Sequence, residues 1–134
     1  MYLLDTNTIS NIARDPNGVA AERYQSKMPS EVGTSIIVSS EVLFGLQNKE
    51  GHRLHGMMMA MLESLTIFNL EQPVDRKYAE LRAHLKAEGR PIGPNDLFIA
   101  AHALALDATL VTGNTSEFSR VPGLKVENWL HAQP

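Results

Sequence analysis

The sequence contains no cysteine, and this absence excludes several kinds of protein. A chain without thiols cannot be held together by disulfides, cannot bind a metal through thiolates and cannot use a cysteine nucleophile. No segment approaches the run of about 20 apolar residues that a membrane-spanning helix needs. No basic stretch followed by an apolar one opens the chain, so nothing resembles a secretory signal. We therefore expect a cytoplasmic protein without membrane association.

An excess of charge of one sign is also missing, because 12 basic and 15 acidic side chains leave a net charge of −3. This balance excludes a protein that coats nucleic acid by bulk charge, so any such contact must be a local patch. A chain of 134 residues, 43% of them hydrophobic, can bury a core and is not disordered. We expect a single domain over residues 1–134, with a loose tail at 131–134.

Short apolar segments alternate with helical patterns along the chain. Strands are predicted at 2–4, 33–38, 65–69, 109–112 and 125–127, and helices at 8–14, 17–28, 39–47, 52–64, 73–88 and 94–106. The strand segments show no clean alternation of polar and apolar residues, which favours strands covered on both faces. The pattern therefore predicts an α/β fold with a central parallel sheet of four or five strands flanked by helices.

Acidic residues lie where the predicted strands end. Asp5 follows the first strand, Glu41 the second and Glu117 the fourth, while Asp96 opens the helix before the fourth strand. The carboxyl ends of parallel strands share one edge of the sheet, and ligands bind there. Each acid also has a structural interpretation, as a helix cap, a first-turn acid or a solvated loop residue. Their shared location favours a functional site.

Carboxylates that are close together repel, so such a cluster needs protons, basic partners or a metal ion. Their hard oxygen ligands favour Mg²⁺, or Mn²⁺, over zinc. A bound ion of this kind activates water and stabilises charge on a phosphate. Arg82, Lys86 and Arg90 recur every four residues and end near Asp96. These basic side chains are either a solvated face or a contact for phosphates.

The histidines and methionines give weaker signals. His52 and His55 have no third ligand nearby, and His102 lies among Ala and Leu, where we expect a packed or hydrogen-bonded ring. The methionine-rich run at 57–61 covers more than one helix face. It is interpreted equally well as core or as a surface for a partner.

Four motifs, in order, resemble those of a known family. They are Leu-Leu-Asp-Thr-Asn at 3–7, Ser-Glu-Val-Leu-Phe-Gly at 40–45, the segment 89–103 around Asp96, and the segments 111–118, 121–124 and 127–129 near the end of the chain. The first two resemble motifs of PIN-domain ribonucleases. The later ones are similar to VapC toxins, in particular the FitB-like and enteric-type members.

The resemblance implies a compact PIN-like domain with the activity of a metal-dependent endoribonuclease. Such a protein is the toxin of a type II toxin–antitoxin pair and cleaves RNA phosphodiesters, here with a leaning towards a structured RNA such as tRNA. The resemblance also implies a homodimer and a larger assembly with a VapB-type antitoxin, which blocks the site. Carried over to this chain, it makes Asp5 and Asp96 ligands of Mg²⁺ or Mn²⁺, with Glu41 completing the acidic set. Thr6 and Asn7 would orient Asp5.

One departure from the family pattern lies after the fourth strand. Asn114 stands about where many PIN domains carry a fourth acid, and either Glu117, three residues on, supplies that acid or Asn114 itself takes its place. An amide can coordinate a metal through its carbonyl oxygen but adds no charge. The sequence is therefore compatible with one bound metal ion or with two.

Two other functions are compatible with an acid after the first strand. A phosphatase of the haloacid-dehalogenase type would use Asp5 as a nucleophile, but it needs a second Asp where this chain has Asn7. A non-catalytic binding module would use the acids only to hold a structural ion or a basic partner.

Overall fold

A five-stranded parallel sheet forms the centre of the protein. The computed structural model describes residues 1–47 and 52–131. The strands are β1 (Tyr2–Leu4), β2 (Val32–Ser35), β3 (Thr66–Phe68), β4 (Thr109–Val111) and β5 (Lys125–Glu127), in the spatial order β3-β2-β1-β4-β5. All neighbouring strands pair in parallel. This confirms the α/β fold, and the strand order reverses between β1 and β4, where open parallel sheets bind ligands.

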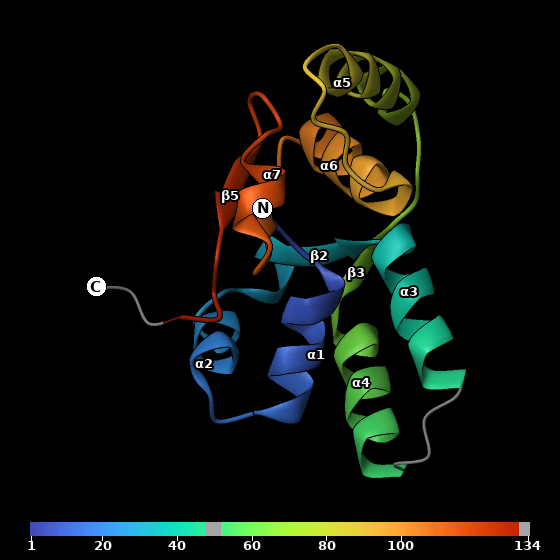
Figure 1. Cartoon of the computed structure of the whole chain (residues 1–134). Helices are drawn as coiled ribbons and strands as arrows, with labels where there is room; N and C mark the ends of the chain where they lie inside the picture. Colours follow the sequence, from blue (N-terminus) through green and yellow to red (C-terminus); the bar gives the residue numbers. More distant parts are fainter. Residues whose placement is uncertain (48–51, 132–134) are drawn as a thin grey trace.

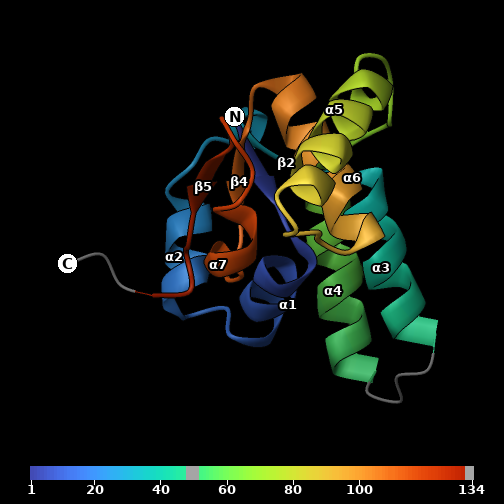
Figure 2. The ribbon, with the colours of Figure 1, turned by 45° about the horizontal axis from the view of Figure 1, so that its top comes forward.

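Helices cover both faces of the sheet. They are α1 (Thr6–Arg14), α2 (Val19–Gln25), α3 (Ile36–Gln47), α4 (His52–Ser64), α5 (Val74–Ala87), α6 (Pro94–Leu106) and α7 (Thr115–Phe118), with a short 3-10 helix η1 at Pro29–Glu31. Figure 1 shows α5 and α6 on one side of the sheet and α1, α2 and α4 on the other. In the turned view of Figure 2, α5 and α6 again lie side by side. Across the described residues, no helix is both long and apolar enough to span a membrane.

The middle strands are buried on both faces. Leu3 and Leu4 of β1 and Leu110 and Val111 of β4 are fully inaccessible to solvent. Successive side chains of a strand point to opposite faces, so complete burial requires helices on both sides. This packing explains why the strand segments carry no alternating pattern.

The second strand is shorter than its predicted range of 33–38. β2 ends at Ser35, and the three β-branched residues that follow form the first turn of α3. The hydroxyl of Ser35 accepts a hydrogen bond from the backbone N–H of Ile37 at 3.1 Å. This contact starts the helix and overrides the weak β preference of Ile and Val. The prediction of strand for 36–38 was therefore wrong.

The methionine-rich run mainly serves the core. Met58 and Met61 are buried, and Met57 packs against them from a half-buried position. Met57 and Met61 also line a groove of about 300 Å³ beside Tyr24 of α2. The run therefore contributes to the core and to the wall of a groove between α1, α2 and α4.

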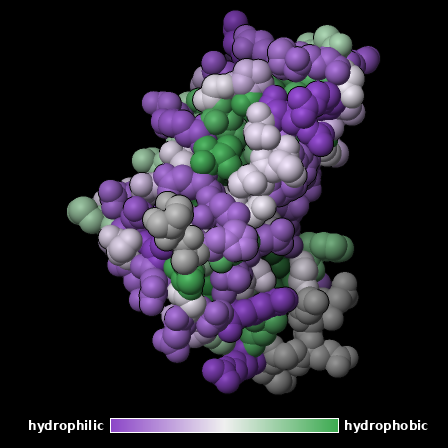
Figure 3. Space-filling view, turned by 60° about the vertical axis from the view of Figure 1, so that its left-hand side comes forward, coloured by the Kyte–Doolittle hydropathy of each residue, from purple (hydrophilic) through white to green (hydrophobic). Residues whose placement is uncertain are grey.

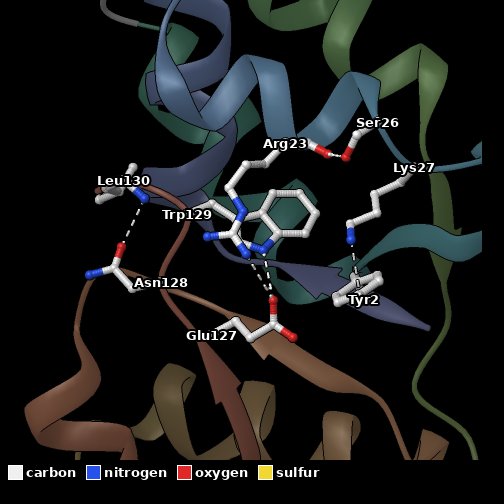
Figure 4. A network of polar contacts seen from close by, with 8 residues as sticks. All are labelled: Tyr2, Arg23, Ser26, Lys27, Glu127, Asn128, Trp129 and Leu130. Atoms are coloured by element: carbon white, nitrogen blue, oxygen red, sulfur yellow. Dashed lines mark hydrogen bonds and ion pairs between the residues drawn. The ribbon is translucent and has the colours of Figure 1, made fainter. Parts of the chain in front are cut away.

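A network of polar and aromatic contacts fixes the C-terminal segment to α2 (Figure 4). The indole N–H of the fully buried Trp129 donates to Glu127 Oε1 at 3.1 Å. Arg23 forms an ion pair with the same oxygen at 3.5 Å, and its guanidinium lies 5.8 Å from the centre of the Trp129 ring. Lys27 lies 4.7 Å from the centre of the Tyr2 ring. The contacts join β1, α2 and the chain after β5.

The surface near β5 is mostly hydrophilic, and its apolar side chains lie in separated patches (Figure 3). Lys125 of this edge strand is exposed and pairs with Asp107 at 3.2 Å. Charged side chains on an edge strand oppose pairing with another sheet. The opposite edge, β3, instead exposes the apolar Ile67.

We expect Trp129→Ala to lower the free energy of unfolding by about 3–5 kcal/mol, because it leaves a cavity and removes the partner of Arg23 and Glu127. Urea denaturation followed by circular dichroism measures the change. Met28→Ala, at a side chain that is 65% exposed, is the control and should change stability by less than about 0.5 kcal/mol. A similar small effect for Trp129→Ala would contradict the packing described here.

Candidate active site

Asp5 is held rigidly at the point where the strand order reverses. It caps α1, and its Oδ1 accepts a hydrogen bond from the backbone N–H of Thr8 at 2.8 Å. Its own backbone N–H donates to the carbonyl of Val111 at 3.0 Å, and the Thr8 hydroxyl donates to the same carbonyl at 3.2 Å. These bonds tie the start of α1 to the end of β4. The capping interpretation of Asp5 is therefore correct, and the cap also sets the position of its carboxylate.

Glu41 lies on α3 and is oriented by Thr6. The Thr6 hydroxyl donates to Glu41 Oε1 at 2.8 Å, across the gap between α1 and α3. Thr6 was predicted to orient Asp5, and this is corrected: Thr8 holds Asp5 and Thr6 holds Glu41. Since α3 begins at Ile36, Glu41 lies in its second turn and not in its first. Asn7 is exposed, and the described contacts include no side-chain hydrogen bond from it to Asp5.

Asp96 and Glu117 complete the acidic set from the other half of the chain. Asp96 lies in the first turn of α6, as predicted, and Glu117 lies on the short helix α7. The side-chain amide of Asn114 donates to Glu117 Oε2, and the backbone N–H of Asn114 donates to Thr112 Oγ1 at 2.9 Å. Asn114 therefore orients the acid that follows it. The helix α7 was not predicted from the sequence.

The pKa of Asp96 shows that other acids lie near it. Burial is the largest cause and, together with the charge of Glu117, a hydrogen bond to it and the charges of Glu41 and Asp5, raises this pKa to about 6. Three acids from separate elements thus act on Asp96. We define these residues, Asp5, Glu41, Asp96 and Glu117, as the acidic cluster.

A buried histidine fixes α6 against the start of α3. His102 Nδ1 lies 2.8 Å from Ser35 Oγ, and burial lowers the pKa of the ring. The Ser35 hydroxyl also accepts from the backbone N–H of Ile37, and which of Ser35 and His102 donates in their bond depends on the tautomer of the ring. The prediction of a hydrogen-bonded His102 is confirmed. Sequence reasoning missed Ser35, since nothing in the spacing of residues 35 and 102 links them.

The donor set of the acidic cluster fits a hard divalent cation. It offers carboxylate oxygens and no thiolate, and the charges of Glu117, Glu41 and Asp5 act against the ionisation of Asp96. In the part of the chain that the structure describes, no three His, Asp or Glu side chains lie close enough together to hold a metal ion as they stand.

The predicted basic row is shorter than expected. Arg82 and Lys86 lie on α5, but the helix ends at Ala87, so Arg90 lies in the loop beyond it. Arg82 Nη1 donates to the hydroxyl of Tyr78 at 3.0 Å. A further basic residue, Arg120, reaches the carbonyl of Pro91 at 3.4 Å and supports this loop. Arg120 has no motif around it that could have identified this contact from the sequence.

Comparison with known sequences identifies the class of protein to which this fold belongs. The PIN domain family matches residues 2–124, and the chain belongs to this family. Within it, the chain belongs with the VapC ribonucleases. Ribonuclease VapC1 of Haemophilus influenzae (strain R2866) is 34% identical over 133 residues, which cover 96% of this chain and 98% of the relative.

Two further relatives also match this chain over nearly its whole length. The tRNA(fMet)-specific endonuclease VapC of Salmonella typhimurium is 30% identical over 130 residues, which cover 96% of this chain and 97% of the relative. The toxin–antitoxin complex VapBC2 of Rickettsia felis, solved with a DNA fragment from its promoter, contains a chain that superposes with a TM-score of 0.87. The two chains are 32% identical, and the match covers 96% of this chain and 98% of that one. These relatives support neither a phosphatase nor a non-catalytic module.

In EDTA, we expect Asp96→Asn to be more stable than the wild type at pH 7.5 by about 1 kcal/mol, after discounting for solvent screening. The folded chain binds a proton at Asp96 with a pKa of about 6, against an ordinary value of 3.8. Its contribution to stability is therefore complete below pH 3.8 and is lost as the pH rises through 6. Urea denaturation at pH 4 and pH 7.5 tests this sign.

The gain should shrink towards zero at pH 4, where the wild-type carboxyl is also protonated. Asp75→Asn, on the exposed surface of α5, is the matched control. A variant that is destabilised equally at both pH values would show that Asp96 is not strained by its neighbours.

Proposed function

We propose that this protein is a metal-dependent endoribonuclease, the toxin of a type II toxin–antitoxin pair. The observation that carries the proposal is the match of the chain to the VapC ribonucleases, and the charges of Asp5, Glu41 and Glu117 near Asp96 support it. Repulsion makes a cluster of acids costly in the folded protein. Binding of a divalent cation and an RNA phosphate would offset this repulsion.

Asp5 and Asp96 are the proposed ligands of Mg²⁺, with Mn²⁺ as the alternative. When bound, the cation lowers the pKa of a water molecule and stabilises negative charge on the phosphate. Asp5 suits this role because the Thr8 N–H holds its carboxylate in one orientation. Glu41 completes the proposed acidic set. The Thr6 hydroxyl donates to Oε1 of Glu41, so Oε2 takes no part in that hydrogen bond.

Glu117 is the proposed fourth acid, and Asn114 is its positioning residue. The hydrogen bond from Asn114 restricts the Glu117 side chain on a short helix that would otherwise leave it mobile. Glu117 lies close enough to Asp96 for its charge to raise the pKa of that carboxyl, and a bound cation would relieve this repulsion. Arg82, Lys86 and Arg90 are proposed to hold the RNA backbone beside the cluster.

A structured RNA such as tRNA is the proposed substrate. Support comes from relatives that are named tRNA(fMet)-specific endonucleases, 27% and 30% identical to this chain. RNA sequence is read mostly in unpaired loops, which a compact domain of this size can reach. Sequencing the 5′ ends that the purified protein generates from total RNA, with and without EDTA, identifies the substrate.

We also propose a cytoplasmic protein that is neutralised by a VapB-type antitoxin and forms a homodimer. The neighbours solved as VapBC complexes support the antitoxin. Exposed apolar side chains support the dimer: Phe44 is 72% exposed on α3, where Leu43 and Ile36 are also exposed, and Ile67 is exposed on β3, which contacts α3. Apolar patches of this kind commonly mark interfaces between proteins.

We expect Asp5→Asn and Asp96→Asn each to lower the rate of RNA cleavage by about a hundredfold or more and to abolish growth arrest on expression. Both substitutions keep the shape of the side chain and remove the charge that holds the cation. Asp75→Asn should cleave RNA like the wild type. Full toxicity of either cluster variant would contradict the proposed function.

Removing divalent cations should abolish cleavage without unfolding the protein, because the fold does not depend on the cation in the way that a zinc finger does. We expect EDTA to stop the reaction, Mg²⁺ or Mn²⁺ to restore it, and the circular dichroism spectrum to stay unchanged. Cleavage that continues undiminished in excess EDTA would exclude the metal-dependent reaction.

A further inference from the structure

A cavity outside the acidic cluster lies between α5, α6 and the loop that joins them. Its volume is about 340 Å³, and its lining includes Tyr78, Arg82, Lys86, Ile92, Pro94 and Leu97. The two helices pack side by side above the sheet, as Figures 1 and 2 both show. The cavity is therefore a feature of the rigid scaffold and does not depend on a free chain end.

The cavity has an apolar floor and a positively charged rim. Ile92 and Leu97 are buried, whereas Arg82 and Lys86 are exposed. Among the described residues that line it, none is acidic. A ligand that suits this lining combines a flat apolar part with a negative charge.

Tyr78 forms the aromatic wall of the cavity, and its side chain is held both at the ring and at the hydroxyl. The ring of Tyr78 stacks on Phe98 with a centroid distance of 4.2 Å and an interplanar angle of 19°. Arg82 donates to its hydroxyl and lies 6.0 Å from its ring centre. An aromatic ring fixed in this way offers a prepared surface for a base, since little side-chain entropy is lost on binding.

We propose that this cavity binds one unpaired nucleotide of the RNA, with the base against Tyr78, Ile92 and Leu97 and its phosphate between Arg82 and Lys86. The inference rests on the proposed function and adds to it a second contact with the substrate. Single-stranded RNA is typically recognised by splayed bases that stack on aromatic side chains. A cavity of about 340 Å³ is at the lower end of ligand-site volumes and suits one base.

The position of the cavity links it to the reaction. Pro94 and Leu97 line it, and Asp96 lies between them in the first turn of α6. Residues 94 and 97 share one flank of the helix, whereas Asp96 projects from another flank. A nucleotide in the cavity would therefore bind a short distance along the strand from the phosphate at the acidic cluster, and would select where the strand is cut.

Binding is tested first without catalysis, by titrating the ¹⁵N-labelled full chain in EDTA with AMP, CMP, GMP and UMP. We expect saturable amide shifts around Tyr78, Arg82 and Ile92 with at least one of these nucleotides. Ile92→Trp, which fills the cavity, and Arg82→Gln should each weaken that binding at least fivefold. Arg76→Gln, which removes an equal charge from the same helix outside the cavity, should leave it unchanged.

The spectrum of each variant also reports whether it is folded, so Arg82→Gln decides the case if Ile92→Trp unfolds. An absence of shifts at these amides with all four nucleotides would overturn the inference. Shifts that Arg76→Gln weakens as much as Arg82→Gln would also overturn it, because they would reflect charge alone. Since no cation or cleavage is involved, these results are independent of the proposed ribonuclease activity.

A second test of the inference measures the cleavage of RNA. We expect Ile92→Trp to raise KM about tenfold with kcat within about twofold of the wild type. Replacing single nucleotides next to the cut by abasic ones should raise KM of the wild type by a similar factor at one position. With the RNA that is abasic at that position, Ile92→Trp should not raise KM any further. An abasic scan with no such position would restrict the cavity to free nucleotides and contradict the proposal.

Discussion

Repulsion between carboxylates is the constraint on which the rest of this structure depends. Burial, and after it the charges of Glu117 on α7, Glu41 on α3 and Asp5 at the end of β1, raise the pKa of Asp96 on α6 to about 6. At an effective dielectric constant near 20, two such charges about 4 Å apart repel by about 4 kcal/mol. A fold selected for stability alone would separate them. The proposed function explains why they stay together, because a cation and a phosphate would offset the repulsion.

The hydrogen bonds around the cluster hold the acids in place against that repulsion. Thr8 fixes Asp5, Thr6 fixes Glu41 and Asn114 fixes Glu117. The bonds to Asp5 and Glu117 lie within the starts of α1 and α7, and the bond to Glu41 joins α1 to α3. The site therefore inherits its geometry from the strand order, in which β1 lies between β2 and β4. Side chains that are oriented beforehand can bind a cation without a large loss of entropy.

The sequence was sufficient for the architecture. Strand segments without alternation, separated by helical patterns, predicted the α/β class, and the acids after the strands remain the predicted site. The strand over 36–38 failed because a single hydroxyl, that of Ser35, starts α3 there. The partner of Thr6, the bond between Ser35 and His102 and the support of the loop by Arg120 could not be predicted. All three join residues that are distant in the sequence, so only the fold places them together.

The central claim is that the acidic cluster binds a divalent cation through Asp5 and Asp96. A crystal structure of the wild-type protein soaked in MnCl₂, with data collected at the manganese absorption edge, tests it most directly. We expect an anomalous peak within about 2.0–2.3 Å of a carboxylate oxygen from each of these two residues. A well-ordered cluster without such a peak, or with manganese bound only elsewhere, would contradict this account of the site.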